Sequence, residues 1–97
     1  MRSPISRFTV SGNSMFPTLK PGQDVLSINW FVNPKVGDIV VVKSGQGTGY
    51  REIVKRVEKL IGGKVWVVGD NKKESTDSRD FGPVSLNQVV GKLIYKT

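Results

Sequence analysis

The sequence contains no cysteine, no histidine and no long hydrophobic run. Without cysteine, the 97-residue chain has no disulfide framework and no thiolate metal site. Without histidine, an activated hydroxyl would need a carboxylate or a lysine as its base. No apolar segment approaches the ~20 residues of a membrane-spanning helix, and no secretory signal precedes the first strand. We therefore expect no bound metal or cofactor, no transmembrane segment or signal peptide, and a location that is cytoplasmic or peripheral to a membrane.

Basic residues outnumber acidic ones by 15 to 8, which gives a net charge of +7. This balance would suit an anionic partner such as nucleic acid, a lipid surface or an acidic protein. It is equally consistent with a basic surface that contacts only solvent. Three aromatic residues, Trp30, Phe31 and Trp66, could stack on bases if they lay on a basic sheet. A nucleic-acid-binding β-barrel is therefore one alternative, although such aromatics also fit ordinary core or rim packing.

Short β-branched runs separated by glycine turns predict one mainly β domain over residues 1–97, a small antiparallel barrel or sandwich. The expected strands are residues 8–10, 25–28, 39–43, 50–60, 65–68 and 89–95. Residues 1–7 read as a frayed lead-in, and residues 44–49 as a hairpin tip. Residues 69–82 read as a long polar loop of the kind that often carries function. One helical turn capped by Ser85 is expected at residues 85–88.

The segment from Ser11 to Leu19 has the composition of a turn that presents a serine. Gly12 and Pro17 bracket Ser14, and Pro17 restricts the residue before it to extended conformations. We expect the turn to expose the Ser14 hydroxyl and to be held on an apolar floor by Met15, Phe16 and Leu19. A hydroxyl at neutral pH needs a base before it can act as a nucleophile.

Lys55 is the best candidate for that base. It lies between Ile53 and Val57 in a predicted strand, so alternation would point all three side chains inward and Arg56 outward. Burial would lower the lysine pKa from its reference value of about 10.4. The alternative is that the Lys55 amine extends to solvent while its aliphatic stem is buried.

Four blocks in order resemble the signal peptidase I family of serine endopeptidases, which use a serine–lysine dyad. The blocks are Ser11–Leu19, Gly37–Val41, Lys55–Val57, and the Gly69-Asp70-Asn71 segment followed by Ser75, Asp77-Ser78-Arg79, Gly82 and Val84. The resemblance implies a β-barrel-like fold of the signal peptidase and self-cleaving repressor type.

The resemblance also assigns roles residue by residue. Ser14 matches the nucleophile, whose backbone N–H is one oxyanion donor, and Lys55 matches the general base. Ser75 matches the hydroxyl that orients the lysine, and Asp77 with Arg79 matches a pair that braces the loop. Read without the resemblance, Asp77 and Arg79 could form a surface pair worth ~1 kcal/mol or less, and Ser75 could simply cap the loop.

Gly12 departs from members that carry a serine at this position, so a second oxyanion donor is not evident. The short spacing between the base block and the last block, together with Trp66–Asn71 and Phe81–Val84, resembles two short branches of the family. These are the maturation protease of nickel-type superoxide dismutase and the mitochondrial-type inner membrane peptidase, and the expected absence of a membrane anchor favours the first. The favoured substrate is therefore the nickel superoxide dismutase precursor, cut in an extended conformation after a small residue. Alternatives are a conventional signal peptidase or a mitochondrial-type inner membrane peptidase; the last block argues against a self-cleaving repressor. The expected partner is a precursor polypeptide rather than nucleic acid. Trp30 and Phe31 could in addition contact a membrane surface.

Overall fold

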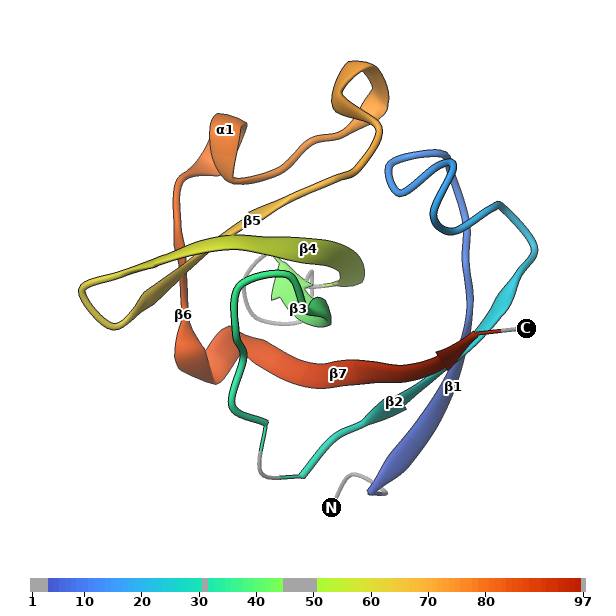
Figure 1. The fold of residues 1–97 in the computed structure, drawn as a ribbon, viewed down its shortest axis with the longest axis horizontal. Helices are drawn as coiled ribbons and strands as arrows, with labels where there is room; N and C mark the ends of the chain where they lie inside the picture. Colours follow the sequence, from blue (N-terminus) through green and yellow to red (C-terminus); the bar gives the residue numbers. More distant parts are fainter. Residues whose placement is uncertain (1–3, 31, 45–50, 97) are drawn as a thin grey trace.

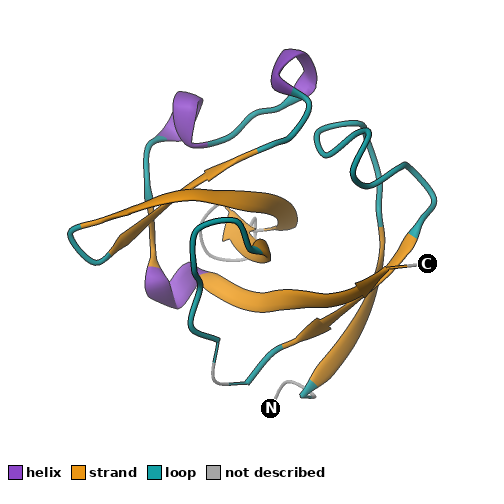
Figure 2. Ribbon diagram, in the orientation of Figure 1, coloured by secondary structure: helices purple, strands orange, loops and turns teal. Residues whose placement is uncertain are grey.

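The computed structural model describes residues 4–30, 32–44 and 51–96. The elements in chain order are β1 (Ile5–Thr9), β2 (Asp24–Ile28), β3 (Ile39–Ser44), β4 (Arg51–Ile61), β5 (Lys64–Val68), η2 (Lys72–Glu74), α1 (Ser78–Phe81), β6 (Val84–Ser85), η3 (Leu86–Gln88) and β7 (Val89–Lys96). The expectation of a mainly β fold with little helix is confirmed (Figure 2). No helix within these described ranges is long and apolar enough to cross a membrane.

The strands form one seven-stranded sheet in the order β1-β2-β7-β3-β4-β5-β6. Every neighbouring pair is antiparallel. Figure 1 shows the sheet strongly curled, with the β1–β2 pair and the β4–β5 hairpin on opposite sides of β7. The last strand of the chain therefore joins the half that carries the serine turn to the half that carries Lys55.

Two hydrophobic clusters fill the interior. The larger one consists of valines from five strands: Val40, Val42, Val57, Val65, Val67, Val84 and Val89. The smaller one, made of Val10, Met15, Leu19 and Val25, lies under the serine turn. Burial of these side chains fixes the turn, because Met15 and Leu19 are only 2% and 0% exposed.

The apolar floor under the serine turn was predicted correctly for Met15 and Leu19, and wrongly for Phe16, which is 43% exposed. The Leu19 N–H donates to the Met15 carbonyl at 2.9 Å, so this segment makes one helix-like turn. Residues four apart in such a turn share a face, which buries Met15 with Leu19 and leaves Phe16 outside.

Two further expectations about the elements were wrong. Residues 5–7 belong to β1, because Ile5 pairs with Ile28 across the β1–β2 ladder. This pairing provides hydrogen-bond partners for the backbone of an otherwise polar segment. The 69–82 loop contains η2 and the short helix α1, whose N-cap Asp77 forms a capping box with Asp80. The expected turn after Ser85 is present as η3. The expected hairpin tip at 44–49 lies outside the described residues beyond Ser44.

Candidate active site

The loop that carries Ser14 is closed at its base by backbone hydrogen bonds. The Val10 N–H donates to the Gln23 carbonyl at 2.8 Å, and the Gly22 N–H donates to the Val10 carbonyl at 2.8 Å. The loop also has an anchor outside its own segment, since the Asn71 N–H donates to the Ser14 carbonyl at 2.8 Å. The backbone of the serine is thus held from both sides.

Lys55 lies on β4 and is only 4% exposed, so the alternative in which its amine reaches solvent is wrong. Val57, two residues further along the strand, is 1% exposed, as the predicted alternation requires. Burial lowers the pKa of Lys55, because the ammonium form loses its hydration. The negative charge of Asp77 opposes this shift, whereas the positive charges of Arg79 and Arg51 lower the lysine pKa further.

A chain of hydrogen bonds leads from the Lys55 amine into the 69–82 loop. The Lys55 Nζ donates to the Ser75 Oγ at 2.9 Å, and the Ser75 Oγ donates to Asp77 Oδ2 at 2.7 Å. Asp77 also accepts the Gly69 N–H at 2.8 Å and two N–H groups of the Arg79 guanidinium at 2.5 and 2.9 Å. The hydroxyl proton of Ser75 is therefore directed to the carboxylate, which leaves its oxygen as the acceptor for the amine.

Asp77 is 0% exposed, so it does not form the surface pair that the sequence left open. Burial by itself would raise the pKa of Asp77, but hydrogen bonds from Arg79, Gly69 and Ser75 outweigh it and hold this pKa well below its ordinary value. Its ionised carboxylate holds the 69–82 loop in place through these charge-assisted hydrogen bonds. The neighbouring Ser78 is also buried and accepts the Val67 N–H at 2.8 Å, which attaches α1 to β5.

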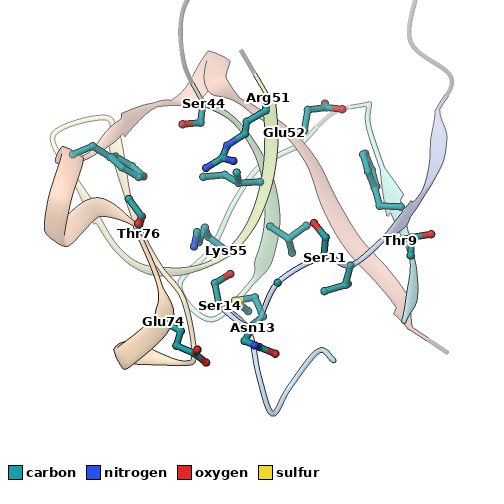
Figure 3. Close-up of a pocket in the computed structure, with 17 residues that line it drawn as sticks. Thr9, Ser11, Asn13, Ser14, Ser44, Arg51, Glu52, Lys55, Glu74 and Thr76 are labelled. Atoms are coloured by element: carbon teal, nitrogen blue, oxygen red, sulfur yellow. The ribbon is translucent and has the colours of Figure 1, made fainter. Parts of the chain in front are cut away.

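Ser14 and Lys55 line the same cavity, which has a volume of about 360 Å³. Figure 3 shows the hydroxyl and the amine turned into this cavity, Ser14 from the turn and Lys55 from β4. The structure thus brings together the loop, the strand and the Ser75–Asp77–Arg79 group, which are far apart in the sequence. A buried amine with a lowered pKa can accept a proton, and a hydroxyl that lines the same cavity can supply one.

A second set of contacts joins the serine turn to β4 and was not anticipated from the sequence. Asp70 accepts the Arg56 Nε and Nη2 groups at 2.8 and 2.9 Å and the Thr18 hydroxyl at 2.5 Å. The third Arg56 contact, from Nη1 to the Gly37 carbonyl, is 2.7 Å long. Hydrogen bonds from Arg56 lower the pKa of Asp70, which keeps the carboxylate ionised. We call Arg56, Asp70 and Thr18 the clamp.

Gly69 stands where these parts meet, and a side chain would not fit there. A Cβ at this position would lie 2.5 Å from the Ser14 carbonyl oxygen and would also overlap the Ser75 Oγ. The glycine is required by close approach rather than by a left-handed φ. Gly12, in contrast, has a φ of +74°, and a Cβ added there would meet nothing within 4 Å.

Other residues considered from the sequence lie elsewhere. Trp30 follows β2 and is 44% exposed, while one face of Trp66 on β5 is covered by the Lys59 amine at 4.8 Å. Phe31 lies outside the described residues. Within the part of the chain that is described, no group of three or more acidic side chains is arranged to hold a metal ion.

Comparison with known proteins shows which family and which relatives this sequence resembles. The family model described as signal peptidase, peptidase S26, matches residues 2–62 and 58–96. A mitochondrial ATP-independent inner membrane protease subunit 1a of Arabidopsis thaliana is 33% identical over 95% of this chain and 70% of its own length. A mitochondrial inner membrane protease subunit 2 of Schizosaccharomyces pombe is 30% identical over 93% of this chain and 63% of its own length. A signal peptidase I of Bacillus caldolyticus is 50% identical over 35% of this chain and 19% of its own length. The chain thus spans 63–70% of the length of the two mitochondrial relatives.

Proposed function

We propose that this chain, which belongs to the signal peptidase family (peptidase S26), is a serine endopeptidase in which Ser14 is the nucleophile and Lys55 is the general base. The observation that carries the proposal is the 4% exposure of Lys55 in the cavity that Ser14 also lines. Burial favours the neutral amine, which is the form that can take a proton.

In this mechanism, Lys55 Nζ removes the proton of the Ser14 hydroxyl as Oγ attacks the carbonyl carbon of the substrate. The Ser14 backbone N–H donates to the oxygen that becomes negatively charged in the tetrahedral intermediate. Lys55 then gives its proton to the leaving amine, and the acyl group stays on Ser14. A water molecule that loses its proton to Lys55 attacks this ester, and Lys55 returns the proton to the Ser14 oxygen as the acyl group leaves as a carboxylic acid.

Ser75 positions the amine in this scheme. Its oxygen accepts one Nζ–H of Lys55 at 2.9 Å while its proton goes to Asp77, so the lysine lone pair is left to face Ser14. Asp77 and Arg79 brace the segment that carries Ser75. Each of these residues acts through Lys55 rather than on the substrate.

We propose a precursor polypeptide as the substrate, bound in an extended conformation and cut after a small residue. The names of the mitochondrial relatives favour an inner-membrane-protease type of activity, which removes the preference for the nickel superoxide dismutase precursor. That precursor remains a substrate to be tested beside precursors that are processed at a membrane.

The direct test is incubation of the purified protein with both kinds of precursor, followed by mass spectrometry of the new N-termini. The wild type is expected to release an N-terminal peptide, whereas Ser14→Ala and Lys55→Met are expected to release none while keeping wild-type melting temperatures or higher ones. Equal cleavage by wild type and Ser14→Ala would refute the proposed nucleophile. Cleavage of only one precursor class would decide between the two branches.

The pH profile tests the base separately. Activity on a peptide is expected to rise with pH until the lowered pKa of Lys55 is passed, and then to level off. A profile that continues to rise toward the ordinary lysine pKa of about 10.4 would contradict a buried base.

A further inference from the structure

In the part of the chain that the structure describes, no strand pairs with one edge of β4 beside the proposed nucleophile. β3 pairs with residues 51–56 of β4, whereas β5 begins to pair only at Arg56, opposite Val68. Among the described strands, residues 51–55 therefore have a neighbour on one side only, and all five of these residues line the cavity. An extended peptide can add to such an edge through its main chain, while its side chains meet alternate faces of the strand.

Arg51 lies at the far end of this edge from the proposed dyad. It is four residues before Lys55, so the two side chains share a face of β4, about 13 Å apart along the strand. Figure 3 shows the Arg51 guanidinium and the Lys55 amine turned to the same side of the strand. Arg51 is exposed, and among the described residues no carboxylate forms an ion pair with it.

The charges around the cavity leave Arg51 as its basic end. Of the described residues that line the cavity, only Arg51 and Lys55 have basic side chains, and burial makes Lys55 a poor cation. The two acidic lining residues face elsewhere: the Glu52 carboxylate points away from Arg51 (Figure 3), and Glu74 accepts an N–H of the Asn71 side chain at 3.0 Å.

We propose that Arg51 is a specificity-determining residue that selects substrates with an acidic side chain about four residues from the bond that is cut. This inference rests on the proposed peptidase function, since it takes Ser14 as the site of cutting. A peptide along the β4 edge places alternate side chains on the Arg51 face, and the fourth residue from the cut reaches the guanidinium. An exposed ion pair of this kind raises kcat/KM about two- to fivefold.

The test uses a peptide series in which one position at a time, two to six residues from the cut on either side, is Glu, Gln or Lys. With the wild type, the Glu peptide is expected to be cut about two- to fivefold faster than the Gln peptide at one position, and the Lys peptide more slowly. With Arg51→Glu, the preference at that position is expected to reverse. The ratio is taken within each enzyme, so any change in the pKa of Lys55 affects all peptides equally.

Lys64→Glu is the matched control, because it changes the net charge equally at an exposed position outside the cavity. It is expected to keep the wild-type ratios. Equal ratios for wild type and Arg51→Glu, or the same reversal in Lys64→Glu, would overturn the inference.

Peptide affinities for the Ser14→Ala variant, measured by fluorescence anisotropy, separate this inference from the proposed function. A Glu preference in binding that Arg51→Glu reverses supports Arg51 as the selecting residue even if no peptide is cut. Absence of cleavage by the wild type would count against the peptidase mechanism alone. Absence of any charge preference in binding would count against the role of Arg51 alone.

Discussion

Replacing Gly69 by alanine should separate the proposed nucleophile from the group that orients the base. The added Cβ would lie 2.5 Å from the Ser14 carbonyl oxygen and 2.6 Å from the Ser75 Cβ, where real Cβ contacts are essentially never below 3.0 Å. Either neighbour must therefore move by about 0.5 Å or more. Both are held in place, Ser14 by the Asn71 N–H and Ser75 by Lys55 and Asp77.

A misplacement of 1 Å at a reacting group can reduce a rate about 10²-fold. Because the two displaced groups lie on either side of Lys55 in the proposed mechanism, we expect kcat/KM to fall about 10- to 100-fold. Overpacking of this kind also costs about 1–3 kcal/mol of unfolding free energy. The assay is kcat/KM on a cleavable peptide together with a urea melt of the same preparation.

Gly91→Ala supplies the matched control, because its Cβ would lie 2.7 Å from Asn29 Oδ1 and 3.1 Å from the Ser27 Oγ. Neither glycine has a left-handed φ, so both substitutions act through crowding alone. Gly91 does not line the cavity, and its variant should lose stability while keeping wild-type kcat/KM. If Gly69→Ala keeps wild-type kcat/KM, or if Gly91→Ala loses as much, the geometric argument is wrong.

Three further substitutions test the electrostatics and the clamp. The folded state holds the Lys55 pKa below the unfolded value of about 10.4, so the unfolded state binds more protons at pH values between the two. Lys55→Met should therefore raise the free energy of unfolding, by an amount that shrinks as pH increases toward 10.4, which urea melts at several pH values would measure. Asp77→Asn should lower the urea midpoint at pH 7. The difference in midpoint between wild type and variant should narrow as pH falls below about 4, because the wild type there loses the stability that its depressed carboxylate pKa provides. Thr18→Val removes the hydroxyl bound to Asp70 and should reduce kcat/KM relative to the wild type, which steady-state kinetics would measure.

The strands were predictable where side chains carry a strong signal. The β-branched residues of β3 and β5 predict buried strands, and Val40 and Val67 are indeed 0% exposed. β1 begins earlier than predicted because its start is defined by pairing with Ile28, and such a long-range pairing leaves no local signal in a polar segment. The helix α1 has only four residues, too few to show a helical period, and its cap residue Asp77 was assigned to another role.

The candidate site was predictable in part for the same reason. Strand alternation indicated that the Lys55 side chain points inward, because the direction of a strand side chain follows from its neighbours, but it left open whether the amine reaches solvent. Only the structure, in which Lys55 is 4% exposed, decides for burial. The hydrogen bond from Lys55 to Ser75 could come only from the family resemblance, because it depends on how the 69–77 loop returns to β4. The approach of Gly69 to Ser14 had no local signal, since a glycine in a polar loop is typical of any turn.

The consecutive residues Lys55 and Arg56 explain how so small a domain can hold two distant segments in register. Their side chains point to opposite faces of β4, so Lys55 contacts Ser75 on one face while Arg56 binds Asp70 on the other. Ser75 and Asp70 belong to the same loop, which therefore contacts both faces of the strand. The loop also binds the serine turn, through the hydrogen bond from the Asn71 N–H to the Ser14 carbonyl. The relative position of the turn and the strand is fixed by hydrogen bonds between ionised and polar groups that are partly shielded from water. Such bonds have narrow geometry, which a cluster of valines alone would not impose.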